Sequence, residues 1–270
     1  MAVLNLMQEV AEESINPRFR ALAAGEIHEK NPGDLVTVAD REAEETLTRV
    51  LQQAYPDAVI LGEEAYSADP AIREGFLAAD HGFTVDPVDG TKNFVNGSPD
   101  HAVMIGEVRR GAAGRGEVTR AWIWQPQHRA AYVAERGAGT WRIDEHGRTR
   151  LHIPAPAEDA SQWRGVTSRW NWVGRGLGEL APLELTWISC GIDYPRLIEG
   201  AATYAIYRRV SAWDHVPGSL LVDEAGGASG NFAGADFTPD LSDDLIVAAG
   251  SRVLATVRAA IADDSERTSA

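Results

Sequence analysis

The chain is organised around one segment, which reads Phe83-Thr84-Val85-Asp86-Pro87-Val88-Asp89-Gly90-Thr91-Lys92-Asn93-Phe94. Its first residues are apolar and β-prone, and the pairs Asp-Pro and Asp-Gly then interrupt that pattern. We expect a short strand that ends in a turn near Asp86, with Thr91 opening a helix or a loop. Such pairs are ordinary turn formers, so a function has to be argued from more than their presence.

The same segment carries oxygen ligands at close spacing. Two carboxylates in one rigid turn, Asp86 and Asp89, can face a common point, and hard divalent cations such as Mg²⁺ prefer oxygen ligands. The backbone carbonyl of Val88, between them, is a further oxygen donor. If Gly90 and Thr91 begin a helix, their N–H groups are positioned to hold an anion. The segment therefore predicts a metal next to a phosphate.

Other patterns for phosphate or metal chemistry fit this sequence less well. Phosphatases that form an aspartyl-phosphate need Asp-x-Asp, and here the gap between the two acids is one residue longer. A P-loop needs Gly-Lys-Ser/Thr after a spaced glycine, and no such run occurs. The histidines are scattered and form no His-x-x-x-His pair, which disfavours a zinc site.

The run from Asp86 to Phe94 resembles the signature of the inositol monophosphatase family. Relatives in that family include bacterial fructose-1,6-bisphosphatases, histidinol-phosphate phosphatases and nucleotidases that act on 3′-phosphoadenosine 5′-phosphate. The resemblance extends over roughly residues 5–260. Three more segments carry it: Asp34-Leu35-Val36-Thr37-Val38-Ala39-Asp40, Gly62-Glu63-Glu64, and Trp213-Asp214 with a downstream Glu224-Ala225-Gly226-Gly227.

The resemblance implies a role for each acid in these segments. Asp40 pairs with Thr91, which orients the attacking water. Glu63 and Asp214 join the metal ligands of the central segment, and Trp213 buttresses Asp214. The implied metal ligands are Glu63, Asp86, the Val88 carbonyl, Asp89 and Asp214. Without the resemblance, simpler interpretations remain, because Asp40 and Asp214 suit helix starts and Glu63 with Glu64 suits a surface loop.

The predicted activity is Mg²⁺-dependent hydrolysis of a small phosphomonoester, either inositol-1-phosphate or a related sugar or polyol phosphate. Two or three Mg²⁺ ions would activate the attacking water and stabilise the leaving oxygen, so neither a covalent phosphoenzyme nor another cofactor is needed. The N–H groups of Gly90 and Thr91 would hold phosphate oxygens. The predicted catalytic residues are Asp40, Glu63, Asp89 and Thr91.

One position departs from the family pattern and bears on the substrate. Relatives that act on inositol phosphate carry a Glu seven positions before the acid of the Trp-Asp pair, and this chain has Tyr207 there, followed by Arg208 and Arg209. Arginine binds phosphate or carboxylate bidentately, so both arginines are candidates for binding a second acidic group of the substrate. The alternative is that they face solvent or pair with acids of the chain.

The predicted activity therefore has rivals. Three lie within the same fold: a fructose-1,6-bisphosphatase, a histidinol-phosphatase or a 3′(2′),5′-bisphosphate nucleotidase. A catalytically silent binding or scaffold protein lies outside this class.

Composition limits the partners and the compartment. The chain has 270 residues, with 25 Lys and Arg against 40 Asp and Glu, a formal net charge of −15. An acidic surface disfavours a nucleic-acid polymer or an anionic membrane as a partner, whereas a bound Mg²⁺ would still allow a small phosphorylated metabolite to bind.

A single cysteine, Cys190, suits a reducing compartment. The N-terminal segment lacks the basic region of a signal peptide, and no apolar run approaches the roughly 18 residues of a membrane span.

We therefore expect a cytoplasmic enzyme with a layered fold. Glycine-punctuated strands between residues 101 and 141 suggest antiparallel meanders, and Pro154-Ala155-Pro156 reads as a linker. We expect an N-terminal α+β half, residues 1–153, that carries most metal motifs, and a C-terminal α/β half, residues 154–270, that completes the site. The resemblance implies an αβαβα sandwich of the sugar-phosphatase type, a homodimer and inhibition by Li⁺.

Overall fold

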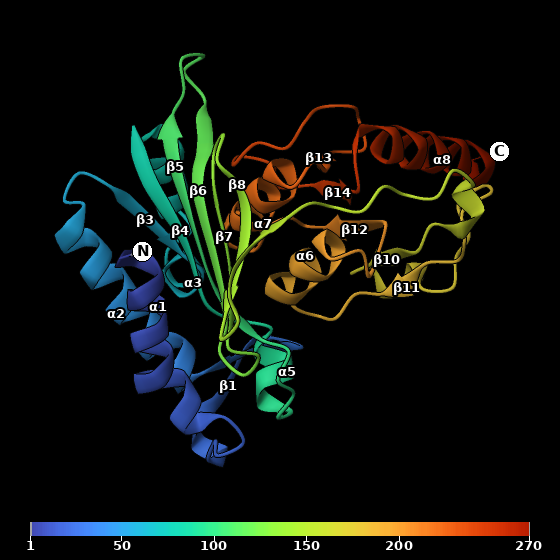
Figure 1. Ribbon diagram of the computed structural model, residues 1–270. Helices are drawn as coiled ribbons and strands as arrows, with labels where there is room; N and C mark the ends of the chain where they lie inside the picture. The colour runs from blue at the N-terminus through green and yellow to red at the C-terminus, as the bar shows by residue number, and fades with distance from the viewer. Residues whose placement is uncertain (1, 270) are drawn as a thin grey trace.

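The structure is a computed structural model that describes residues 2–269, with the side chains of residues 2–23 and 25–264. Five layers follow one another: N-terminal helices, a seven-stranded sheet, a pair of helices, a five-stranded sheet and a C-terminal helix (Figure 1). This is the αβαβα sandwich expected from the sequence. Within the described residues, no helix is both long and apolar enough to cross a membrane.

The first layer consists of two helices and a hairpin. Helix α1 (Ala2–Val10) continues through a wide helical turn (Ala11–Ile15) into a 3₁₀ turn (Asn16–Arg18), where Pro17 ends the helical run. Another 3₁₀ turn (Ala24–Glu26) leads into the antiparallel strands β1 (Ile27–Asn31) and β2 (Asp34–Thr37), followed by helix α2 (Val38–Ala54). Strand β1 was not expected, because its residues are mostly polar and show no apolar alternation.

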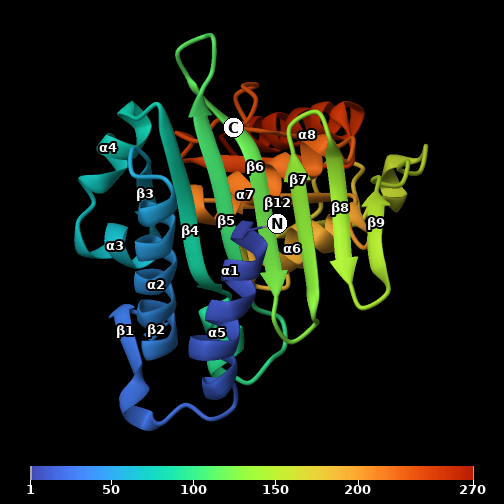
Figure 2. The same cartoon turned by 60° about the vertical axis from the view of Figure 1, so that its left-hand side comes forward.

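The large sheet runs in chain order. Its strands are β3 (Val59–Gly62), β4 (His81–Asp89), β5 (Ala102–Arg110), β6 (Gly116–Gln125), β7 (Ala130–Glu135), β8 (Gly139–Asp144) and β9 (Gly147–Leu151). Only β3 and β4 are parallel, because helices α3 (Glu63–Ala68) and α4 (Ile72–Ala78) connect them. The short helix α5 (Thr91–Val95) follows β4, and α1 and α2 cover one face of the sheet (Figure 2).

The second sheet has the order β11-β10-β12-β14-β13 and is mixed. Its strands are β10 (Gly165–Thr167), β11 (Glu184–Leu185), β12 (Tyr204–Arg208), β13 (Ala228–Gly230) and β14 (Asp244–Ala248). The helices are α6 (Cys190–Ile198), α7 (Ala212–Glu224) and α8 (Ser251–Ser269), with 3₁₀ turns at Ala160–Gln162 and Trp170–Trp172. The expected division of the chain at residues 153 and 154 falls between the two sheets and stays a prediction.

Three apolar cores separate the layers. One contains Met7, Leu47 and Phe83, between α1, α2 and the large sheet. A second contains Met104, Tyr194 and Leu220, where α6 and α7 pack between the two sheets. A third contains Ile206, Ile246 and Val257, between the small sheet and α8. Burying each such side chain contributes about 1.5–3 kcal/mol, so α6 and α7, although late in the chain, are fixed against the first sheet.

Strand β4 departs from the expected turn near Asp86. It runs on to Asp89, and its pairing with β5 shifts register on the way: Asp86 lies opposite Met104, and Asp89 lies opposite Ala102. Over this interval β4 contains one more residue than β5, which defines a β-bulge. Pro87, which has no N–H to donate, lies inside the irregularity. The bulge bends the end of β4 at the position of the predicted metal ligands.

Candidate active site

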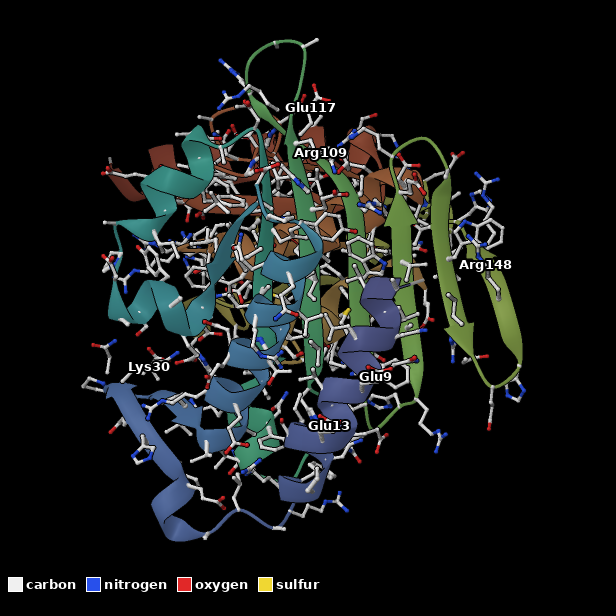
Figure 3. All side chains as sticks on the ribbon, turned by 90° about the vertical axis from the view of Figure 1, so that its left-hand side faces the viewer. Glu9, Glu13, Lys30, Arg109, Glu117 and Arg148 are labelled. Carbon is white, nitrogen blue, oxygen red and sulfur yellow. The ribbon has the colours of Figure 1, made fainter. Side chains whose placement is uncertain are left out.

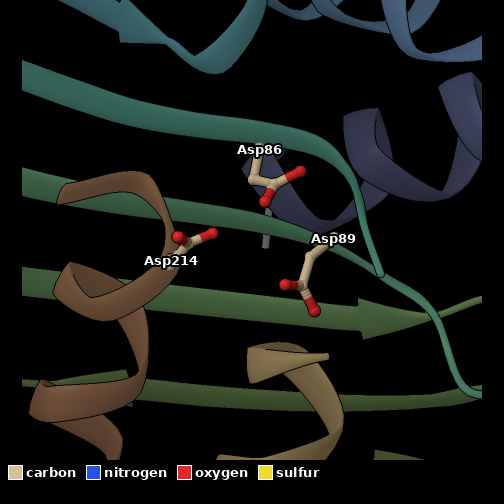
Figure 4. A group of neighbouring side chains, drawn as sticks. All are labelled: Asp86, Asp89 and Asp214. Carbon is tan, nitrogen blue, oxygen red and sulfur yellow. The ribbon is translucent and has the colours of Figure 1, made fainter. Parts of the chain in front are cut away.

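Three predicted ligands meet at the end of β4. Asp86, Asp89 and Asp214 each offer a carboxylate oxygen, and these oxygens lie within 4.8 Å of one another. Figure 4 shows the three carboxyl groups directed at a shared space, two from β4 and one from the first turn of α7. Segments more than a hundred residues apart in the chain thus converge, as the sequence predicted.

The electrostatics of this cluster fit a divalent cation. Burial raises the pKa of Asp86 well above its ordinary value, and repulsion from Glu63, Asp89 and Asp214 raises it further. The pKa of Asp214 is also raised well above its ordinary value, mainly by burial and then by repulsion from Asp89 and Glu63. Buried like charges are unfavourable unless a cation or a proton compensates them. A set of carboxylate oxygens at this spacing is the donor chemistry that Mg²⁺ or Ca²⁺ prefers.

The N-terminus of α6 orients Asp89. Oδ2 accepts hydrogen bonds from the Ser189 hydroxyl and, at 2.7 Å, from the Gly191 N–H, while Oδ1 accepts one from the Cys190 N–H at 3.1 Å. Burial raises the pKa of Asp89, and these hydrogen bonds oppose the rise. Sequence reasoning missed Ser189. Its signal was a small hydroxyl residue at the start of a helix, but its hydroxyl binds Asp89 instead of capping its own helix.

Thr91 and Asp40 form the predicted pair. Thr91 Oγ1 lies 3.0 Å from Asp40 Oδ1 and 3.1 Å from the carbonyl oxygen of Val88. Asp40 also accepts a 2.8 Å hydrogen bond from the N–H of Thr37, the residue that caps α2. Both interpretations of Asp40 therefore hold: it stabilises a helix start and it contacts Thr91. Burial raises its pKa to about 6, so at neutral pH it is mostly ionised and accepts a hydrogen bond from the Thr91 hydroxyl.

Gly90 makes the sharp turn between β4 and α5. Its φ is +82°, and a Cβ built there would lie only 2.9 Å from the Cβ of Ser189. Both facts require glycine, because other residues rarely adopt this conformation and because the two segments approach too closely for a side chain.

Glu63 lies beside the three-acid cluster and is held by a cation of the chain. Its Oε1 is 2.7 Å from Lys30 Nζ, which also lies 2.9 Å from Oε1 of Glu64. Burial raises the pKa of Glu63 to about 7, and the charge of Lys30 opposes this. Sequence reasoning gave Lys30 no part in the site. Its only signal was a lone lysine just before the Asp-Leu-Val-Thr segment.

Glu44 positions the helix that carries Glu63. It is buried in α2 and accepts 2.8 Å hydrogen bonds from the N–H groups of Glu64 and Ala65, in the first turn of α3. A Cβ at Gly62 would lie 2.4 Å from the Glu44 carboxyl group, so the glycine makes room for this contact. Sequence reasoning missed Glu44, although an acid next to the apolar stripe of Ala43 and Leu47 was a usable signal.

A pocket of about 250 Å³ opens beside the acids. Asp89 and Asp214 line it together with Arg208 and Arg209, so the predicted substrate residues and two predicted metal ligands border the same space. The other lining residues are Ser168, Trp170, Leu185, Thr186, Ile188, Ser189, Cys190, Asp193, Tyr207 and His215. A larger hollow of about 380 Å³, over strands β6 to β9, lacks the three-acid cluster.

Comparisons with known proteins agree with this geometry. A family model described as the inositol monophosphatase family matches residues 2–267. An inositol-1-monophosphatase of Rhizobium meliloti is 31% identical over 243 residues, which cover 84% of this chain and 85% of that protein. A Nus factor SuhB of Pseudomonas aeruginosa is 29% identical over 249 residues, 86% of each chain.

Solved structures share the fold. A Thermotoga maritima IMPase superimposes with a TM-score of 0.78, covering 98% of this chain and 97% of its own, at 23% sequence identity. At that identity the likeness concerns the layered architecture, which agrees with the order of helices and sheets described above.

Proposed function

The chain belongs to the inositol monophosphatase family and is a phosphoric monoester hydrolase, and from that premise we propose that it hydrolyses a small phosphomonoester with Mg²⁺. The observation that carries the proposal is the convergence of Asp86, Asp89 and Asp214, whose ligand atoms lie within 4.8 Å of one another. The substrate would be a sugar or polyol phosphate.

The acids at the end of β4 would hold the metal. Asp86, Asp89 and Asp214 are the core ligands, and the Val88 carbonyl is a further oxygen at the same turn. Glu63 would join them by exchanging its ion pair with Lys30 for the cation. When bound, two or three Mg²⁺ ions would supply positive charge that offsets the acids and lowers the pKa of a water molecule.

Thr91 would position the water. With its one hydroxyl proton donated to ionised Asp40, Thr91 would keep the lone pairs of Oγ1 free to accept a hydrogen bond from a water molecule. This contact would hold the water oxygen towards phosphorus and give its proton a path to Asp40. The N–H groups of Gly90 and Thr91 would hold phosphate oxygens, and no side chain of the chain needs to become phosphorylated.

The rivals differ in the substrate or in the class of function. A fructose-1,6-bisphosphatase, a histidinol-phosphatase or a 3′(2′),5′-bisphosphate nucleotidase would use the same acids. A catalytically silent binding protein is the alternative outside this class, and one similar relative does carry the name of a Nus factor. The presence of every acid named in the predicted mechanism opposes it, because a silent protein is free to lose at least one. The cytoplasmic location and the homodimer stay predictions.

A panel of phosphomonoesters tests the proposal. Phosphate release is measured with and without Mg²⁺, and with Li⁺ added, for the wild-type protein and for Asp89→Asn. We expect Mg²⁺-dependent release that falls by orders of magnitude in the variant. Asp57→Asn is the matched control, because Asp57 is exposed and lies before the start of β3, whereas Glu63 follows the end of that strand. Release by Asp89→Asn at the wild-type rate, or no release from any phosphomonoester, would refute the assignment.

A further inference from the structure

We propose that the alcohol part of the substrate carries a second anionic group, a carboxylate or a phosphate, and that Arg208 and Arg209 bind it. This inference rests on the proposed function, since it assumes that the reacting phosphate lies at the acids of β4 and α7. It names the substrate class from the two arginines that line the same pocket.

The pocket is lined by charges of both signs. Asp89 and Asp214 border it on the side of the metal ligands, and Arg208 and Arg209 border it where β12 ends. The remaining acid of the lining is Asp193, whose oxygens accept a 2.8 Å bond from the Trp187 N–H and a 3.2 Å bond from the Tyr207 hydroxyl.

Those contacts leave the two arginines as the charges that a ligand meets. Asp193 is buried, and its carboxyl oxygens are occupied by the Trp187 N–H and the Tyr207 hydroxyl. Once a cation offsets the acids of β4 and α7, the remaining formal charge around the alcohol part of the substrate is positive. Arginine is the side chain that best matches the geometry of carboxylate and phosphate.

Both guanidinium groups are available. The side chain of Arg208 is 58% exposed, and its nearest acid, Asp244, is 3.9 Å away, at the limit of an ion pair. Exposed pairs of this length hold their partners weakly. Among the described residues, Arg209 forms no ion pair or side-chain hydrogen bond.

The backbone brings both arginines to the pocket. Consecutive residues of a strand point to opposite faces, so a regular β12 would direct only one of the two towards it. Arg209 instead adopts φ +59°, a left-handed conformation that non-glycine residues rarely take. Such conformations persist where the surrounding structure or a function maintains them. The chain turns at Arg209, and Tyr207, Arg208 and Arg209 all border the same space.

Tyr207 also favours an anion over a bare polyol. It is buried, stacks on Tyr194 with ring centroids 6.0 Å apart, and donates its hydroxyl to Asp193. A carboxylate at this position would accept hydrogen bonds from hydroxyl groups of a polyol. Here the position carries a tyrosine held in the wall, and the next two residues carry only donors, which suit an acidic group.

Matched substrate pairs test the inference. Glycerol 2-phosphate and 2-phosphoglycerate differ only in a hydroxymethyl group against a carboxylate, and fructose 1-phosphate with fructose 1,6-bisphosphate supplies the phosphate arm. For each pair we measure kcat/KM with Mg²⁺. The ratio divides the kcat/KM of the member with the second anionic group by that of the member without it. The wild-type ratio should exceed 10 in at least one arm, and Arg208→Gln/Arg209→Gln should lower it about 10- to 100-fold, mainly through KM.

Two further variants control for charge. Arg209→Lys should keep part of the ratio, because it keeps the cation but not the bidentate geometry. Arg148→Gln removes the same charge from β9, on the outer part of the large sheet (Figure 3), and should leave the ratio unchanged. The arm with the larger ratio identifies carboxylate or phosphate as the second group.

The outcomes separate this inference from the proposed function. A wild-type ratio near one in both arms, or an unchanged ratio in Arg208→Gln/Arg209→Gln, would overturn the role of the arginines while leaving a phosphatase. If no substrate is hydrolysed, the proposed function fails. The same pairs are then compared by thermal shift with Mg²⁺. The inference is supported if the member with the second anionic group stabilises the wild-type protein more and this difference is lost in Arg208→Gln/Arg209→Gln. Equal stabilisation by both members overturns it.

Discussion

Asp86 and Asp89 direct their carboxylates at the same space because one extra residue is inserted into β4 between them. Residues three apart in a regular strand point to opposite faces of the sheet. The bulge removes that alternation, so one strand supplies two oxygen donors to one site. The first turn of α7 then needs to supply only Asp214 to complete the cluster.

Removal of one acid should separate activity from stability. In Asp86→Asn, the amide oxygen still accepts the N–H of Val88, but the buried charge is gone. Phosphate release should fall at least 100-fold because a metal ligand is lost. Without metal, the midpoint of thermal unfolding should rise by about 2–4 °C, the effect of roughly 1 kcal/mol in a chain of this size. A lower midpoint in EDTA would contradict the repulsion that we infer in the cluster.

Thr91 and Asp40 should act as one unit. Thr91→Val should lower kcat by about 10²- to 10⁴-fold, the range for positioned proton transfer, while Thr91→Ser should retain most of it. Asp40→Asn should lower kcat by a similar factor, and the kcat of the double variant should be little lower than that of either single variant. Only the changes at Asp40 should lower thermal stability, because that side chain also bonds the start of α2. Fully additive losses would show that the pair does not cooperate.

Lys30 should compete with the metal for Glu63. In Lys30→Gln the carboxylates of Glu63 and Glu64 lose their cation, so the local potential becomes more negative. The Mg²⁺ concentration for half-maximal phosphate release should therefore fall several-fold. Arg49→Gln removes one positive charge from an exposed position of α2 and is the control. A higher Mg²⁺ requirement in Lys30→Gln would mean that Lys30 helps to build the site.

The metal-free protein should lose stability as the pH rises from 6.5 to 8.5. The pKa values of Glu44 and Glu63 are raised by burial to about 7, and that of Asp193 to about 8. The folded state then binds more protons than the unfolded state, so its stability is greatest at low pH and declines through these pKa values.

The pH window matters for this test. Below pH 6.5 the buried His101 and His215, whose pKa values burial lowers to about 4 and about 3, act in the opposite direction. Above pH 6.5 both histidines are neutral in the folded and in the unfolded state, so the raised pKa values of the acids determine how stability changes with pH. Thermal unfolding in EDTA should show the decline, and Mg²⁺ should reduce it because the cation binds the deprotonated acids. A midpoint that rises over this range would contradict the raised pKa values.

Much of the site was predictable because its residues lie in short, specific segments. Asp86, Asp89 and Asp214 were chosen from spacing and resemblance, and the structure brings them together. The layered fold followed from the same resemblance. The contacts around Glu63 were not predictable. Lys30 pairs with Glu63 from 33 residues away, and Glu44 bonds the N–H of the next residue, Glu64, from 20 residues away. Such tertiary contacts leave no local periodicity in the sequence.

The bulge in β4 was also out of reach of sequence patterns. Asp-Pro and Asp-Gly indicate an interruption, but they do not distinguish a turn from a strand that continues with a shifted register. Whether the strand continues depends on its pairing with β5, in which Asp86 lies opposite Met104 and Asp89 lies opposite Ala102. Strand β1 was missed for a similar reason, because its polar residues become a strand only by pairing with β2.

The central claim is that one cation site lies between Asp86, Asp89 and Asp214, and anomalous diffraction with Mn²⁺ in place of Mg²⁺ tests it most directly. Crystals are grown at a Mn²⁺ concentration at which phosphate release is measured. We predict an anomalous peak in contact with oxygens of all three carboxylates, which is absent in Asp86→Asn. No peak there at a concentration that supports hydrolysis, or a peak only elsewhere in the molecule, would contradict the account.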